Sequence, residues 1–346
     1  MKKKVVVGMS GGVDSSVAAL LLKEQGYDVI GVTMETWDNE GTESVAEDAK
    51  RVADVLQIPH YVVDFRKIFR EKVVDYFINE YEQGRTPNPC LVCNRYVKWE
   101  ALLHRSMEMG CDYIATGHYG RIVQCPNGRF SVAKSDSVGK DQSYVLYNLT
   151  QNELSKTLFP LYEYEKQEIR KIAMENNIPV AMKKDSQDIC FIPDHDYASF
   201  IQKMTGRKSI PGNFVDMNGK ILGEHKGILH YTVGQRKGLG IAFGEPKFVV
   251  TIRPDTNEVV LGNQEELMTS EVLLKDVNYM SVEDITSSIR VTGKLRYSQK
   301  DTPCTLTKES DGILKAVFDE PMRAPTPGQA GVFYQDNCII CGGTII

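Results

Sequence analysis

Three cysteines are the residues of this chain best suited to covalent chemistry. Cys90 and Cys93 form a Cys-x-x-Cys pair in a proline-containing loop, and Cys190 lies in a later segment. Reduced cysteines in a cytosolic chain favour catalysis or metal binding over a structural disulfide framework. Such a pair is half of a metal site, a redox pair or a coincidence. Lys183 and Lys184 would lower the pKa of the Cys190 thiol if they fold toward it.

A second chemical feature is a glycine-rich turn near the start of the chain. The apolar run Val5–Met9 is typical of a buried parallel strand, and Val17–Lys23 has helical periodicity that ends at Gly26. Asp28–Met34 fits a second strand. Strand, glycine turn, helix and strand form a βαβ unit, which implies a parallel sheet.

The turn between the first strand and the helix predicts an anion site. Gly11 and Gly12 let backbone N–H groups approach phosphates at a helix N-terminus, and Asp14 could hold Mg²⁺ there. The turn matches neither the Walker A motif nor the dinucleotide fingerprint. Ligands bind at the carboxyl ends of parallel strands, where Met34 and Gly117 also fall. The residues expected at the nucleotide are Gly8, Met9, Ser10, Gly11, Gly12, Val13, Asp14, Ser15, Met34 and Gly117.

The segment Ser10–Ser15 resembles the pyrophosphatase loop (PP-loop) of the ATP α-hydrolases. That resemblance implies cleavage of ATP between the α and β phosphates, with Mg²⁺, so that AMP is left on a substrate oxygen. Over essentially its whole length the chain resembles the tRNA-specific 2-thiouridylases. The matching stretches are Gly8–Ser16, Asn88–Asn94, Gly117–Tyr119, Lys140–Ser143, Ser186–Phe191 and His230–Gly238.

The family resemblance implies a role for each matching position. Cys93 looks like the nucleophile and Cys190 like the persulfide carrier, with a transient Cys93–Cys190 disulfide. The implied reaction replaces the carbon-2 oxygen of the wobble uridine in Lys, Glu and Gln tRNAs by sulfur. The implied partners are tRNA and a sulfur donor protein, either a cysteine desulfurase or a sulfur relay protein. Residues expected to contact tRNA are Asn88, Pro89, Cys90, His118, Lys140, Asp141, Gln142, Arg296, Tyr297 and Gln329. For His118, a purely structural role is nearly as well supported.

One position departs from part of the family. Cys90 stands where many members have aspartate, so Cys90, Cys93 and Cys190 could instead hold a four-iron four-sulfur cluster. Two further alternatives stay open. One is a PP-loop enzyme that uses ammonia or an amine, which would have no use for the three cysteines. The other is a tRNA- or nucleotide-binding redox sensor without turnover.

Length and composition set the frame for these motifs. A chain of 346 residues is expected to form two or three domains, and a net charge of −5 argues against non-specific coating of nucleic acid. We expect an α/β fold: a doubly wound parallel sheet of the PP-loop type, a small central domain and a C-terminal β-barrel. The predicted boundaries are 1–206, 207–270 and 271–346. No apolar run could span a bilayer, and we expect a cytoplasmic protein.

Overall fold

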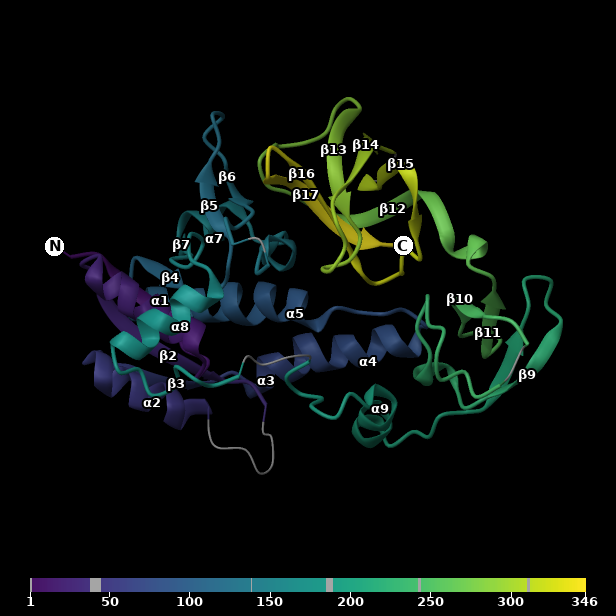
Figure 1. The fold of residues 1–346 in the computed structure, drawn as a ribbon, viewed down its shortest axis with the longest axis horizontal. Helices are drawn as coiled ribbons and strands as arrows, with labels where there is room; N and C mark the ends of the chain where they lie inside the picture. The colour runs from purple at the N-terminus through teal and green to yellow at the C-terminus, as the bar shows by residue number, and fades with distance from the viewer. Residues whose placement is uncertain (1, 38–44, 138, 185–188, 242–243, 310–311) are drawn as a thin grey trace.

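The computed structural model describes residues 2–37, 45–137, 139–184, 189–241, 244–309 and 312–346 (Figure 1). The Ser186–Asp188 part of the last cysteine motif lies outside the described residues. Among the described residues, no helix has the length and apolar character needed to cross a membrane.

The N-terminal region is built on a five-stranded sheet in the order β3-β2-β1-β4-β7. All four neighbouring pairs are parallel, as the βαβ pattern predicted. The strand order reverses direction between β1 and β4, which places a switch point beside the glycine turn. The strands are β1 (Lys4–Gly8), β2 (Asp28–Glu35), β3 (His60–Asp64), β4 (Tyr113–Ala115) and β7 (Thr157–Leu158).

Helices cover both faces of this sheet because β1 is apolar on both sides. Val5 and Val7 pack with α1, α2 and α8, whereas Val6 packs with the helices of the opposite face. A strand that is buried on both faces is typical of a doubly wound sheet, which confirms that prediction. The helices of this region are α1 (Val13–Glu24), α2 (Val45–Leu56), α8 (Lys166–Glu175), α6 (Leu102–Glu108) and the π-helical η2 (Cys93–Ala101).

A helical layer extends from this region toward the rest of the chain (Figure 1). Within it, α3, η1 and α4 follow one another without a break, and a short loop then leads to α5. The bounds are α3 (Arg66–Phe69), η1 (Arg70–Val74), α4 (Asp75–Glu82), α5 (Pro89–Val92), η3 (Ser143–Leu146), α7 (Gln151–Ser155) and α9 (Tyr197–Thr205). The last of these, α9, precedes the small sheet that follows in the chain.

A small sheet follows in the order β10-β11-β8-β9. Its core contains Phe214, Tyr231 and Val249, all at most 3% exposed. The elements are β8 (Gly212–Val215), β9 (Ile221–His225), η4 (Ile228–His230), β10 (Phe248–Arg253), β11 (Glu258–Gly262) and η5 (Glu265–Leu267).

The C-terminal region is a closed six-stranded antiparallel barrel, as predicted. Strands follow the order β12-β15-β14-β13-β16-β17, and β17 pairs back to β12. The bounds are β12 (Met268–Tyr279), β13 (Ile289–Lys294), β14 (Thr302–Lys308), β15 (Leu314–Arg323), β16 (Ala330–Gln335) and β17 (Cys338–Ile345). Between β16 and β17, Asp336 and Asn337 have φ of 50° and 65° and turn the chain. Asn and Asp tolerate that conformation better than other side chains.

The barrel is joined to the N-terminal region by a hairpin that the sequence analysis did not anticipate. Strands β5 (Arg121–Gln124) and β6 (Phe130–Ala133) extend the barrel sheet through the pair Ala133 and Cys338. Side chains reinforce the joint, since Lys294 of the barrel lies 4.0 Å from the Asp141 carboxylate and Lys134, directly after β6, pairs with Asp301 of the barrel. The barrel is therefore docked on the sheet region.

Candidate active site

The glycine turn lies between the end of β1 and the start of α1. Ser16 Oγ donates to the Gly12 carbonyl at 2.8 Å, and the Ser10 N–H donates to Ser15 Oγ at 3.1 Å. Gly11 has φ +61°, and a Cβ there would lie 2.8 Å from the Val45 carbonyl oxygen. The serine hydroxyls therefore fix the turn itself, while the helix N-terminus supplies the positive end of its dipole.

Gly117 meets this turn backbone to backbone. A Cβ on Gly117 would lie 2.7 Å from the Ser15 nitrogen and 2.8 Å from the Asp14 carbonyl carbon. The sequence analysis expected glycine here because a nucleotide comes close. The structure gives a different reason, which is contact with the start of α1.

The Asp14 carboxylate is held by two other segments. It accepts hydrogen bonds from Tyr119 Oη at 2.8 Å and from Lys166 Nζ at 2.7 and 2.8 Å. Gln142 in turn fixes Tyr119, because its side-chain oxygen accepts from the Tyr119 N–H and its own N–H donates to the Tyr119 carbonyl. Sequence reasoning missed Lys166, which lies on α8. To bind Mg²⁺, Asp14 would have to exchange this ammonium for the metal.

Other residues expected at the nucleotide lie at the same edge of the sheet. Met9 follows β1 and is 1% exposed, with its N–H donating to the Val32 carbonyl and its own carbonyl accepting from Thr33. Met34 lies near the end of β2 and packs partly buried against the apolar cores. Both methionines are thus held by contacts within the protein, and their roles toward a nucleotide stay predictions.

The cysteine pair is placed by a helix start. Asn88 Oδ1 accepts from the Cys90 N–H at 3.1 Å and caps α5, whose first residue is Pro89. Cys93 then opens the π-helical η2. From the other segment, Phe191 anchors Cys190 because its ring lies 5.5 Å from those of both Phe69 and Phe77.

The three thiols lie close enough to influence one another's ionisation. Burial raises the pKa of Cys93 to about 12 and that of Cys190 to about 11, and neighbouring cysteines add to both shifts. Burial also raises the pKa of Cys90. Cys90 and Cys190 are exposed residues, yet burial is the largest cause of the raised pKa of each thiol. None of the three is in a disulfide in this structure. A neutral thiol is a poor nucleophile.

The cation beside these thiols is Lys98, which sequence reasoning also missed. Its charge acts against the raised pKa of Cys90, Cys93 and Cys190. Lys98 is five residues after Cys93, a spacing that a π-helical turn brings onto one face. The idea that Lys183 turns toward Cys190 is wrong, because Lys183 forms an ion pair with the buried Asp48.

His118 lies against Lys98 in a fully hydrogen-bonded setting. Its Nδ1 is 2.7 Å from Thr116 Oγ1 and its Nε2 is 3.4 Å from Lys98 Nζ. Burial and the Lys98 charge lower the pKa of His118 well below its usual range, so the ring is neutral. This arrangement favours the structural role for His118, with Lys98 as the group that His118 orients.

A metal centre is not apparent in this arrangement. In the part of the chain that the structure describes, no three His, Cys, Asp or Glu side chains form a group able to hold a metal ion. A four-iron four-sulfur cluster held by Cys90, Cys93 and Cys190 therefore stays an untested alternative.

Several residues expected to contact tRNA carry interactions within the protein. Asp141 accepts from Ser143 Oγ at 2.9 Å, and Arg296 donates to the Ala324 carbonyl at 2.7 Å. Gln329 donates to the Thr86 carbonyl at 2.7 Å. Tyr297 is 45% exposed, and its ring lies 6.2 Å from that of Tyr144 in an edge-to-face arrangement. Their roles toward RNA stay predictions.

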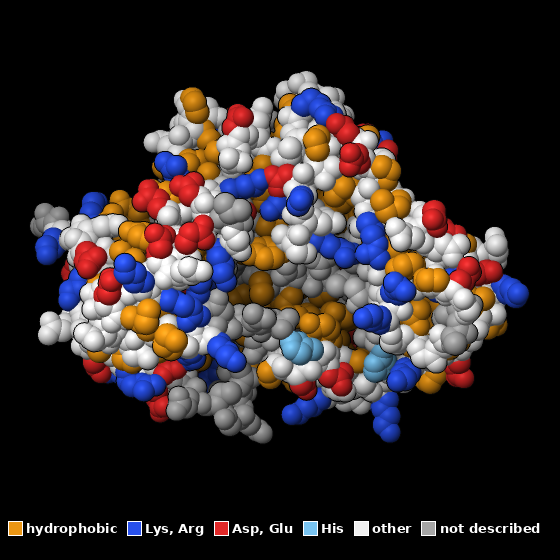
Figure 2. All heavy atoms as spheres, viewed as in Figure 1, with side chains coloured by type: hydrophobic (Ala, Val, Ile, Leu, Met, Phe, Trp, Pro, Cys, Tyr) orange, Lys and Arg blue, Asp and Glu red, His pale blue; other side chains and the backbone are white. Residues whose placement is uncertain are grey.

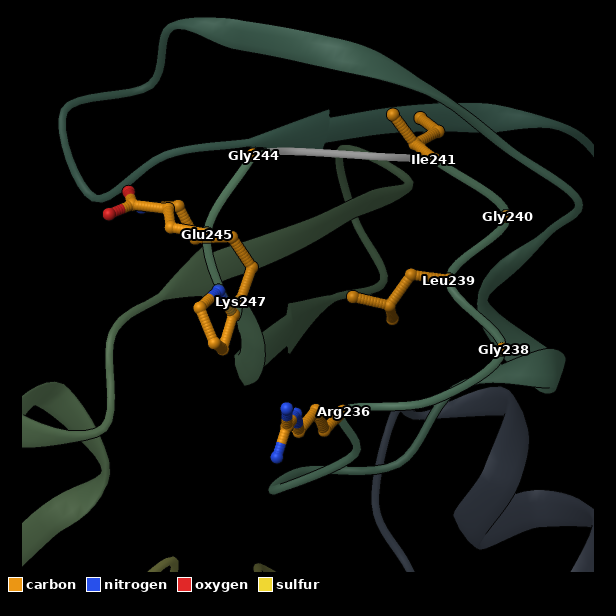
Figure 3. Close-up of a pocket in the computed structure, with 9 residues that line it drawn as sticks. Arg236, Gly238, Leu239, Gly240, Ile241, Gly244, Glu245 and Lys247 are labelled. Atoms are coloured by element: carbon orange, nitrogen blue, oxygen red, sulfur yellow. The ribbon is translucent and has the colours of Figure 1, made fainter.

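A separate open pocket of about 590 Å³ lies in the central region (Figure 3). Leu239 points across it toward Lys247, and Arg236 lies at its edge. Its lining contains no cysteine and no part of the glycine turn. The pocket is therefore not where the sulfur and nucleotide chemistry is assembled.

The fold and site define a class, and family models identify it. Residues 3–194 match a tRNA methyl transferase HUP domain, 198–263 match the PRC-barrel domain of that group, and 269–345 match an aminomethyltransferase beta-barrel domain. The chain thus has three domains, and its HUP domain carries the glycine turn, Cys90, Cys93 and Cys190.

Curated relatives narrow the class to one family. The chain is 58% identical to tRNA-specific 2-thiouridylase MnmA of Lachnoclostridium phytofermentans, over 99% of both chains. It is 51% identical to the protein of that name from Clostridium kluyveri, over 100% of this chain and 99% of that one. The chain belongs to the tRNA-specific 2-thiouridylase family. Among solved structures, U34-tRNA thiolase NcsA of Methanococcus maripaludis matches at 20% identity and a TM-score of 0.36, over 59% and 66% of the two chains.

Substituting Gly117 tests the contact between the turn and the loop after β4. Gly117→Ala should lower the free energy of unfolding by about 1–3 kcal/mol, because the new methyl overlaps backbone atoms. We expect ATP affinity, measured by calorimetry, to fall at least about tenfold, since the start of α1 must move. Gly139→Ala is the control, because a Cβ there meets no atom within 4 Å. Equal ATP affinity in both variants would contradict the assignment.

Substituting Lys98 tests the electrostatics of the thiols. Removing the cation in Lys98→Met raises the thiol pKa further, and each unit lowers the thiolate fraction about tenfold. Iodoacetamide labelling of Cys93 and Cys190 at pH 9, followed by mass spectrometry, should slow about three- to tenfold. Lys98→Arg should retain most of the rate. Lys72→Met, a cation over the Tyr96 ring, is the matched control. Unchanged labelling in Lys98→Met would show that Lys98 does not act on the thiols.

Proposed function

We propose that this chain is an ATP-dependent tRNA sulfurtransferase that replaces the carbon-2 oxygen of a uridine by sulfur. The observation that carries the proposal is that Cys93 packs against the apolar cluster containing Phe191, the neighbour of Cys190, in the domain that bears the PP-loop-like turn. Membership of the 2-thiouridylase family supports the same reaction. The wobble uridine of Lys, Glu and Gln tRNAs is the proposed target.

The first proposed step is adenylation. The carbon-2 oxygen attacks the α-phosphorus of ATP, pyrophosphate leaves, and the base carries an AMP ester. The glycine turn and the N-terminus of α1 would bind the phosphates, and Asp14 with Mg²⁺ would orient them. Lys166 donates to Asp14 in this structure. When Asp14 turns to the metal, the Lys166 ammonium would be released to neutralise phosphate charge.

The second proposed step transfers sulfur. The terminal sulfur of a Cys190 persulfide attacks carbon-2 and expels AMP, and Cys93 thiolate then attacks the inner sulfur. This leaves a carbon–sulfur double bond on the base and a Cys93–Cys190 disulfide, which an external thiol must reduce with two electrons. A sulfur donor protein would load Cys190. Lys98 would favour the Cys93 thiolate that the step requires.

The surface supports an RNA partner despite the negative net charge. Figure 2 shows Lys and Arg side chains gathered around a hollow in the middle of one face. Arg236, Lys237 and Arg323 are exposed basic residues of the central and barrel regions. A local basic surface is sufficient to bind phosphates. We propose that tRNA lies across this face with its target base directed toward Asn88 and Cys90.

Separating the two steps tests the division of labour. Cys93→Ala and Cys190→Ala should each abolish 2-thiouridine formation, measured by nucleoside mass spectrometry, because the sulfur route is cut. Each should retain tRNA-dependent pyrophosphate release within about twofold, since adenylation uses the glycine turn. Cys125→Ala, outside the site, should behave as the parent. Loss of pyrophosphate release in either site variant would reject the assignment.

The role of Cys90 separates the persulfide route from the cluster route. With the persulfide route, Cys90→Ala should keep at least about a third of the thiolation rate, because Cys93 and Cys190 suffice. Anaerobically purified protein should then be active without iron. Iron retained by the parent protein, together with complete loss of activity and of iron in Cys90→Ala, would favour the cluster.

A further inference from the structure

The loop that carries the cysteine pair is hydrogen-bonded to the barrel through the backbone of Thr86. The Thr86 N–H donates to the Pro327 carbonyl at 2.9 Å, and Gln329 Nε2 donates to the Thr86 carbonyl at 2.7 Å. Thr86 lies between α4 and α5, two residues before the Asn88 cap. Both hydrogen-bonding groups of its backbone are thus held by another domain.

The barrel end of this contact is fixed. The Gln329 N–H donates to the Thr326 carbonyl at 3.1 Å, and the Gln329 carbonyl accepts from the Ile345 N–H at 2.8 Å. Thr326 is 1% exposed, and its hydroxyl accepts from Arg296 at 2.8 Å. The Gln329 amide therefore projects from a backbone that cannot shift without disturbing β17 and Arg296.

The cysteine-loop end has little room to move independently. A Cβ on Gly328 would lie 3.2 Å from Arg85 Cβ, from Glu80 Oε2 and from the Thr86 carbonyl oxygen. Arg85 is also paired with Glu80, whose side chain is 9% exposed. The barrel loop and the cysteine loop are therefore packed as one unit, in which Gln329 supplies the side-chain hydrogen bond to the Thr86 carbonyl.

We propose that Gln329 is a positioning residue, which acts through the Thr86 carbonyl to hold Cys90 and Cys93 in register for the target base. This inference rests on the proposed function and deepens it. It differs from the expectation that Gln329 contacts tRNA, because the side-chain donor is already engaged by the protein. Docking of the barrel on RNA would thereby be coupled to the placement of the thiols.

Gln329→Met tests the proposal because it preserves length and removes the donor. In RNA-free protein, amide hydrogen exchange in residues 85–93 should accelerate about threefold or more, as expected for a lost hydrogen bond. The kcat of thiolation should fall about three- to tenfold, with tRNA Kd within about twofold of the parent value. Gln329→Lys restores a donor and should recover part of the exchange protection and part of the kcat. Gln335→Met, an exposed glutamine of β16, is the control.

The outcomes separate this proposal from its alternatives. Unchanged exchange in residues 85–93 would overturn it. So would tRNA binding weakened at least about tenfold with an unchanged kcat, which would make Gln329 an RNA contact. The exchange measurement needs neither tRNA nor turnover. A parent protein without thiolation activity would therefore reject the proposed function and still leave the positioning role to be judged by exchange.

Discussion

The site depends on one backbone-to-backbone contact, in which Gly117 lies against the first turn of α1. Since no Cβ fits between them, the loop after β4 and the glycine turn are held at a fixed separation. Tyr119, two residues on, can then reach Asp14, and Gln142 can hold Tyr119. Asp141, which directly precedes Gln142, forms an ion pair with Lys294 of the barrel. The nucleotide loop is thus connected to the barrel through a few short steps.

The sulfur chemistry is set by a balance between burial and a single cation. Burial keeps Cys93 and Cys190 protonated, and Lys98 opposes that effect. Thiols held this way react slowly with adventitious oxidants, because oxidation proceeds through the thiolate. Reactivity then has to come from a change at the site, such as loading of sulfur or approach of the activated base. The same environment explains why neutral His118 suits this position: a protonated ring would place a positive charge 3.4 Å from the Lys98 ammonium.

The parts of this protein that depend on local sequence could be predicted, and the parts that depend on distant contacts could not. The turn at Gly11, the stop at Gly26 and the alternation of the barrel strands are local, and the sheet class follows from them. Lys166 lies on α8 and Lys98 on the π-helical η2, and nothing in the sequence of either segment marks the lysine. Lys183 resembled a partner for Cys190 only by proximity in sequence, and the buried Asp48 carboxylate attracts it more strongly.

The barrel has its own apolar core, so its attachment to the rest of the chain needs a separate explanation. Interfaces between domains are usually polar enough to permit relative motion. Here β6 joins β17, Lys294 of the barrel pairs with Asp141, and both backbone groups of Thr86 bond to one barrel loop. Contacts of three kinds at three separate points resist rotation about any one of them. A rigid attachment has a use if a long RNA held by the barrel must deliver one base to thiols in another domain, because angular play at the barrel would be magnified at the base.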